Sequence, residues 1–372
     1  MARSLPNPVK SETALQTAVL QTALPPASIR LAPALRPGLL IGLTGLLIAI
    51  FLLCLVLGSV NIPLDQIVRV LLGGEADKAA WTNIILKFRL PKAITAVFAG
   101  AALSVSGLLM QTFFRNPLAD PFTLGINSGA SLGVALVVLT IGSVGGTVLA
   151  GLGFLNDVSL AVAASIGAGF TMLLMIFTAR QVKSTATLLI VGLMFGSLVG
   201  ALVSLLLFFS IPDRIQAFLN WGFGTFGSVT WSQLVILIPA ITVGLILAFL
   251  LSKSLNALLS GEAYARSMGL NVPLTRTLVI LATGILSGTV TAFCGPIGFL
   301  GIAVPHLCRG LFHTSDHRIL TPAVMLVGAT AALIAVLIAE VPGSSLVLPV
   351  NAITALMGAP VVIHVILRQQ RG

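Results

Sequence analysis

Long uncharged stretches of apolar residues recur along this chain and limit its possible folds more strongly than any other feature. A helix needs about 20 apolar residues to cross the hydrocarbon core of a bilayer. Of the 372 residues, 57% are apolar and 8% are charged, whereas a soluble domain carries about 25% charged residues. The sequence therefore predicts an all-α integral membrane protein with crossings in Leu39–Val60, Ala93–Phe114, Pro121–Asn156, Val158–Ala179, Ser184–Pro212, Trp231–Ser252, Ile319–Ala339 and Val341–Leu367.

One further uncharged stretch, Thr277–Cys308, is broken at Gly295-Pro296 and forms either one long span or two short ones. Both ends of the chain are basic, and basic segments stay in the cytoplasm. Two cytoplasmic termini require an even number of crossings, so we expect a split at Gly295-Pro296 and ten crossings. We predict a flexible cytoplasmic tail at residues 1–38 and a ten-helix transmembrane domain at residues 39–368.

The net charge of +10 could also indicate a nucleic-acid-binding protein. Here, however, the basic residues are spread between the apolar runs, as the positive-inside rule predicts for the loops of a membrane protein. The three cysteines, Cys54, Cys294 and Cys308, lie in apolar runs without the spacing of metal ligands. We expect no nucleic-acid partner, no metal site and no cofactor.

The chain has no Gly-x-x-x-x-Gly-Lys-Ser/Thr loop, so any ATP that drives it is bound by another subunit. The longest cytoplasmic loop, residues 253–276, contains Glu262 and Arg266 at the favourable i, i+4 spacing. Gly269 suits a helix C-terminal cap. This pattern predicts a short amphipathic helix outside the membrane, and a simple capped surface loop remains the alternative.

Proline-marked turns flank several spans. Asn116-Pro117 follows the second span. The Asn116 side chain can hydrogen-bond the local backbone, so we predict a rigid turn there. Pro296, with Gly295, marks the break in Thr277–Cys308. After it, His306 and Arg309 lie on one helical face, where a histidine at a membrane edge is usually packed or reaching toward the interface.

Five stretches, in this order, together resemble the FecCD-type permease family of ABC importers, which imports ferric siderophores, haem and cobalamin. They are Arg89–Lys92 with Gly100–Leu103, Gln111–Gly125, Gly261–Gly269, Gly295–Arg309 with Asp316–Arg318, and Gly358–Pro360. The resemblance covers about residues 40–368. It implies the type II importer permease fold, a homodimer or paired heterodimer in the inner membrane, a pair of ATP-binding subunits and an extracytoplasmic substrate-binding protein.

The resemblance also implies roles for particular residues. It assigns contact with the ATPase to a coupling helix that includes Gly261, Glu262, Ala265, Arg266 and Gly269. It assigns docking of the binding protein to the outer surface near Arg89, Lys92 and Glu340. The sequence departs from the family there: an Asp, an Arg four residues later and Glu-Leu-Pro are usual, but Val336, Glu340 and Val347-Leu348-Pro349 stand in their places.

Two other classes of membrane protein fit the sequence less well. A secondary transporter or channel usually places ionisable residues near the membrane midplane, and none of the ten acids here falls there, Glu340 at an outer end being the nearest. An intramembrane hydrolase would pair a nucleophile with a histidine. Ser104 and Ser106 are available, but His306 and His364 are expected near the inner face.

Overall fold

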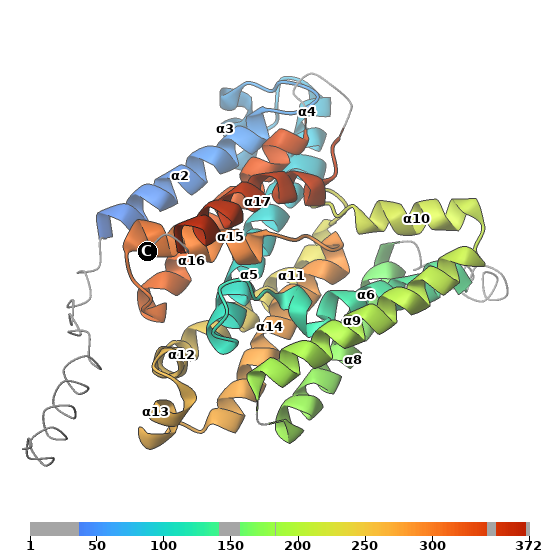
Figure 1. Ribbon diagram of the computed structural model, residues 1–372. Coiled ribbons are helices and arrows are strands. Elements are labelled where there is room, and N and C mark those ends of the chain that lie inside the picture. Colours follow the sequence, from blue (N-terminus) through green and yellow to red (C-terminus); the bar gives the residue numbers. More distant parts are fainter. Residues whose placement is uncertain (1–36, 141–156, 183, 341–346, 370–372) are drawn as a thin grey trace, which may run out of the picture. The chain divides into compact units, whose positions relative to one another are not determined.

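The computed structural model describes residues 37–140, 157–182, 184–340 and 347–369 (Figure 1). The predicted tail, residues 1–38, lies outside them except for its last two residues, which begin the first described helix. Within the described residues, the β-structure is limited to one bridge between Glu340 and Val347.

Among the described residues, seven long and three shorter apolar helices lie in the predicted crossing segments and confirm the fold class. The long ones are α2 (Pro37–Val56), α5 (Leu90–Phe113), α8 (Asp157–Gln181), α9 (Thr185–Phe208), α11 (Trp231–Leu250), α14 (Val272–Cys294) and α16 (His317–Ala339). The shorter ones are α6 (Ile126–Ala135), α15 (Leu300–Phe312) and α17 (Val350–Gln369).

Short helices connect these spans. They are α3 (Leu64–Leu71), α4 (Ala79–Asn83), η1 (Ile84–Arg89), η2 (Pro121–Leu124), η3 (Leu136–Thr140), α10 (Pro212–Gly222), α12 (Ser252–Leu259) and α13 (Glu262–Ser267). Helices α4 and η1 run straight into α5, so this helix extends from Ala79 to Phe113 and starts well before the predicted Ala93. On the orientation predicted from the basic residues, we call the end that carries α13 the inner end and the end that carries α3 the outer end.

The uncharged stretch around Gly295-Pro296 forms two helices, as parity predicted. Helix α14 ends at Cys294, and Gly295 follows with φ of +75°. Few residues other than glycine adopt this left-handed conformation, and Pro296 has no N–H with which to continue the helix. Helix α15 begins four residues later at Leu300.

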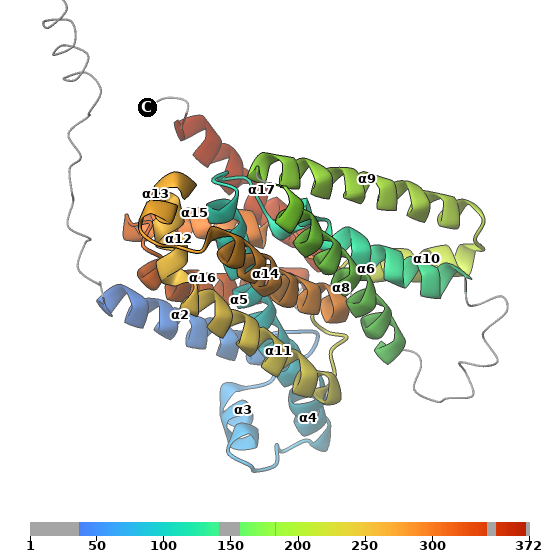
Figure 2. The same ribbon diagram turned by 90° about the horizontal axis from the view of Figure 1, so that it is seen from below.

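Helix α5 lies at the centre of the bundle, and the most apolar helix lies at its edge. In the most apolar 18-residue stretch of Ala79–Phe113, 83% is buried inside the protein. In the corresponding stretch of α2, 11% is buried. Helix α16 packs along α5, and α14 packs against α5, α8 and α11 (Figures 1 and 2). Because α2 is apolar all round and barely buried, its surface is suited to lipid or to another subunit.

Glycines set the closest helix crossings. A Cβ at Gly107 of α5 would overlap the backbone of Gly301 in α15, and one at Gly100 would overlap the backbone of Gly328 in α16. Small residues of this kind let helix backbones approach closely in membranes, where no hydrophobic force drives helices together.

Candidate functional site

Arg89, predicted to face a partner, points into the protein at the outer end. It is 5% exposed, and its Nη1 donates to the carbonyls of Leu55 (2.6 Å) and Val56 (2.9 Å), while its Nη2 donates to that of Val60. The last carbonyls of a helix lack partners within that helix, and a positive charge there is favourable. Arg89 therefore caps the C-terminus of α2 in this structure.

Lys92 and Glu340 form an ion pair with each other, and each side chain is 20% exposed. Glu340 lies at the C-terminus of α16, so its charge alone would oppose the dipole of that helix. Lys92, inside the continuous helix Ala79–Phe113, offsets this effect by pairing with it. The pairing also gives a structural reason for an acid at position 340, where the family usually has arginine.

We expect Arg89→Gln to lower the free energy of unfolding by about 2–3 kcal/mol, because hydrogen bonds from a charged donor to buried carbonyls are lost. The matched control is Lys87→Gln, an exposed charge two residues away in η1. Thermal unfolding of both purified variants in detergent checks this. An equal Tm for the two variants would show that Arg89 does not cap α2.

The predicted coupling segment contains two short helices, α12 and α13. Gly261 (φ +105°) and Gly269 (φ +84°) bound α13 on either side. Glu262 lies 3.5 Å from its predicted partner Arg266, but its other oxygen lies 2.6 Å from Arg276 in the first turns of α14. Since Arg276 is much less exposed than Arg266, Glu262 connects α13 to a span chiefly through Arg276.

Ala265 lies on the opposite side of α13 from the surface that a partner could reach. It is 0% exposed and packs with Leu258 and Val272. The exposed large hydrophobic side chains here are Tyr264 (55%) in α13 and Met268 (54%) just past its end. The resemblance implies that Ala265 belongs to the helix that contacts the ATPase, but its side chain lies in a buried apolar contact, which a charge there would disrupt.

A chain of polar contacts connects α12 to two central spans. Asn256 of α12 donates to Asp316 (2.6 Å) and accepts from the backbone N–H of His317 (2.9 Å) at the start of α16. The His317 Nε2 lies 2.9 Å from Thr112 Oγ1 in α5. These contacts connect the predicted coupling segment to α16 and α5, in addition to its contact with α14.

The turn after α5 is held by its own side chains. Asn116 Oδ1 accepts from the Leu118 N–H (3.0 Å), and the carbonyl of Pro117 lies 2.8 Å from His306 Nε2 in α15. Asp120 accepts from the Phe122 N–H. Burial raises the pKa of the Asp120 carboxyl to about 7, although this hydrogen bond acts in the opposite direction.

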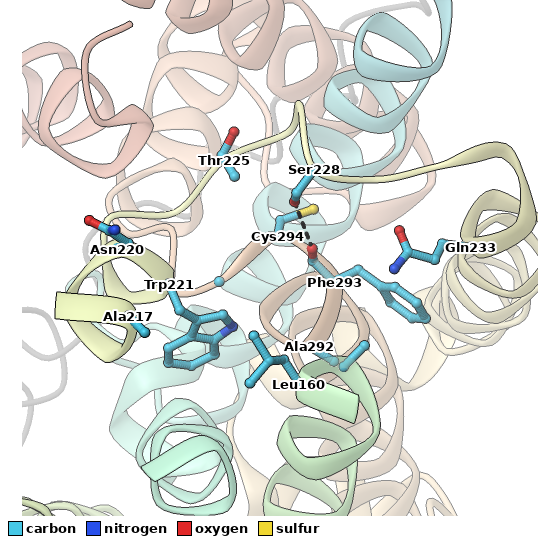
Figure 3. A pocket seen from close by; sticks show the side chains of 12 residues that line it. Leu160, Ala217, Asn220, Trp221, Thr225, Ser228, Gln233, Ala292, Phe293 and Cys294 are labelled. Carbon is cyan, nitrogen blue, oxygen red and sulfur yellow. Dashed lines mark hydrogen bonds between the residues drawn. The ribbon is translucent and has the colours of Figure 1, made fainter. Parts of the chain in front are cut away.

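A pocket of about 220 Å³ lies at the outer end, between α8, α10 and the end of α14 (Figure 3). It is lined by Asn220 and Trp221 of α10, by Phe293 of α14, and by Ser228 from the loop between α10 and α11. A cavity of about 610 Å³ adjoins it and shares Phe293, Gln233 and Ala161. Ile166 (67% exposed) and Ile236 (62% exposed) line this second cavity, which therefore opens on the side faces of α8 and α11.

Neither cavity offers a route across the bundle for a large substrate. Pockets for drug-sized ligands hold about 300–1,000 Å³, and the outer pocket is smaller than this. The second cavity faces sideways, where exposed isoleucines are typical of a lipid-facing surface. Among the described residues, no three or more His, Cys, Asp or Glu side chains are grouped as a metal site.

Sequence reasoning missed the inward contacts of Arg89, the Lys92–Glu340 pair and the Arg276–Glu262 pair. The one available signal was the acid at position 340 in place of the usual arginine. An acid at such a position often pairs with a basic side chain nearby, as Glu340 does with Lys92. The predicted binding-protein role of Arg89, Lys92 and Glu340 and the predicted ATPase role of α13 stay predictions.

Comparison with known proteins gives a consistent result along the chain. The model of the FecCD transport family matches residues 46–368. The vitamin B12 import system permease protein BtuC of Klebsiella pneumoniae is 38% identical over 331 residues, covering 89% of this chain and 94% of that protein. The uncharacterized ABC transporter permease protein YvrB of Bacillus subtilis is 35% identical, covering 85% of this chain and 89% of that protein. A solved structure described as an inward-facing conformation of a metal-chelate type ABC transporter superposes with a TM-score of 0.77 at 30% identity, covering 89% of this chain and 99% of that one.

Proposed function

The chain belongs to the FecCD transport family, and from that premise we propose that it carries a metal-centred chelate, such as a ferric siderophore, haem or cobalamin, across the inner membrane. The family match and the similarity to BtuC show that the chain is a permease subunit of an ABC importer of the FecCD and BtuC type. Permeases of this kind transport without catalysing ATP hydrolysis themselves.

The observation that carries the substrate proposal is the family match over residues 46–368. It begins within α2 and ends within α17, so it covers part or all of every apolar helix among the described residues. One relative is named for vitamin B12 and one solved structure for metal chelates. These two ligand types have in common a metal ion enclosed by a large organic ligand. We therefore assign the class of substrate by that shared chemistry.

We propose that two copies of the chain form a homodimer and that the substrate passes between them. The small outer pocket and the sideways cavity support this, because neither offers a substrate of this size a route within one copy. Helix α9 supports it as well, since its exposed apolar face, which includes Met194, Leu198 and Phe208, is available to a partner.

An ATP-binding subunit pair is proposed to dock at the inner end on Tyr264 of α13 and Met268 just past its end, two exposed hydrophobic side chains. The contacts of Glu262 and Asn256 would pass its movement to α14, α16 and α5. The orientation that this requires, with both termini in the cytoplasm, rests on the distribution of basic residues.

An extracytoplasmic binding protein is proposed to dock at the outer end near Lys92 and Glu340. Because these two charges neutralise each other, the attraction that they offer a charged partner is weaker than two separate charges would give. Arg89 would act there by positioning the end of α2.

Uptake by cells tests the substrate class. We expect deletion of the gene for this chain to abolish accumulation of one labelled metal chelate. The chelates to be compared are cobalamin, haem and a panel of ferric siderophores. Expression of the chain from a plasmid should restore accumulation. Labelled free iron and cobalt salts are the controls and should be unaffected. Loss of free-ion uptake with unchanged uptake of every chelate would contradict the proposal and favour a channel or secondary transporter.

A further inference from the structure

A pocket of about 300 Å³ lies at the inner end, where α5, α12 and α15 meet. It is lined by Arg115, Arg309 and His306, with Gln111 and Leu259. No acidic side chain lines it. Within the described residues, neither arginine forms an ion pair with a carboxylate.

Gln111 fixes Arg309 in this pocket. The amide nitrogen of Gln111 donates to the carbonyls of Gly301 and Ile302 at 3.2 Å each, so its oxygen is directed away from them. That oxygen accepts from Arg309 Nη1 at 2.6 Å. A guanidinium has five N–H donors, and within the part of the chain that the structure describes this amide is its hydrogen-bond acceptor. Arg309 is therefore held in place with donors left for a ligand.

Arg115 closes the pocket from the other side. It follows α5 in a left-handed conformation, with φ of +50°. Its Nη1 would lie 3.7 Å from a Cβ at Gly261, so its guanidinium lies over the start of α13. Arg115 comes from the turn after α5 and Arg309 from α15, and both line one cavity. This arrangement suits an oxyanion with several acceptor oxygens.

The surroundings of the pocket are apolar and exposed. Leu118 (42%), Leu307 (47%) and Leu311 (41%) lie on the turn and on the helix that supply His306 and Arg309. Basic pockets between spanning helices on the cytoplasmic side bind lipid headgroups, and the anionic inner leaflet concentrates such lipids there. A lipid accounts for both features, because its headgroup would enter the pocket and its chains would cover the leucines.

We propose that this inner basic pocket binds the phosphate group of an anionic phospholipid of the cytoplasmic leaflet. The proposal rests on the orientation stated above, but it requires neither the ATPase nor any particular transported substrate. Failure of the substrate assignment would therefore leave it untouched.

Native mass spectrometry of the full-length chain in mild detergent tests the proposal, with phosphatidylglycerol and phosphatidylcholine as probes. We expect wild type to bind phosphatidylglycerol about tenfold more tightly than phosphatidylcholine, because charge-assisted hydrogen bonds favour the anionic headgroup. Arg115→Gln should remove that preference. Arg115 is exposed, so this change should leave the fold intact, and Arg318→Gln, an exposed arginine at the same end, should bind like wild type.

Three results would overturn the proposal. The first is an equal preference for phosphatidylglycerol in wild type and Arg115→Gln. The second is full displacement of the lipid by millimolar inorganic phosphate, which would identify a soluble anion as the occupant. The third is loss of the bound lipid on assembly with the ATPase together with weaker ATPase binding by Arg115→Gln, which would identify an acidic side chain of that subunit.

Discussion

Replacing Gly107 with alanine is expected to abolish most of the folded protein, although the change adds a single methyl group. That methyl would overlap the backbone of Gly301, and a backbone cannot move aside as the end of a flexible side chain can. Helices α5 and α15 would have to separate where α5 is most buried. Overpacking a well-packed core costs about 1–3 kcal/mol and occasionally more, and backbone contact places this case at the upper end.

The matched control is Gly169→Ala in α8, where no heavy atom lies within 4 Å of the added Cβ. There, alanine should stabilise the helix by about 0.5–1 kcal/mol, because glycine loses more conformational freedom on folding. Size-exclusion profiles and Tm values of both variants in detergent provide the measurement. A Gly107→Ala protein as abundant and as stable as Gly169→Ala would show that α5 and α15 do not cross as closely as described.

Reversing the surface chemistry of α13 should abolish transport while leaving the protein folded. Tyr264 and Met268 are more than half exposed, so Tyr264→Arg with Met268→Glu should change no buried contact. These opposite charges can pair with each other at i, i+4, but removing both from water in an interface still costs several kcal/mol, so transport should fall at least about tenfold. ATP-driven uptake in proteoliposomes, compared at equal amounts of folded permease, measures this effect.

Two controls separate docking from folding. Tyr264→Phe retains the ring and should transport at nearly the wild-type rate. Ala265→Glu should instead reduce the amount of folded protein, since Ala265 is buried against Leu258 and Val272. Wild-type transport by the Tyr264→Arg, Met268→Glu double variant would remove α13 from the interface with the ATPase.

The sequence predicted the features that depend on local chemistry. Apolar length defined the spans, and Gly295 with Pro296 marked the break between α14 and α15, because glycine alone adopts that φ readily and proline lacks the N–H. The i, i+4 spacing predicted the contact between Glu262 and Arg266, whose Oε2 and Nη2 atoms lie 3.5 Å apart. In each case the interacting groups are a few residues apart, so no tertiary information is needed.

Long-range contacts could not be predicted in this way. Arg89 reaches carbonyls 29 to 34 residues earlier in the chain, and Lys92 meets Glu340 from a different helix. The burial of Ala265 could not be predicted, because a six-residue helix is too short for its apolar periodicity to show which face is buried. A membrane-edge charge looks the same in sequence whether it points to a partner or to a neighbouring helix.

The central claim is that this chain is a transport subunit that depends on a separate ATPase. The most direct measurement is uptake of the chelate identified in cells by proteoliposomes that contain the purified chain, with and without its ATPase and binding protein. We expect uptake only when all three proteins and ATP are present, and no ATP hydrolysis by the chain alone. Uptake by the chain alone, driven by a proton gradient without ATP, would contradict the claim.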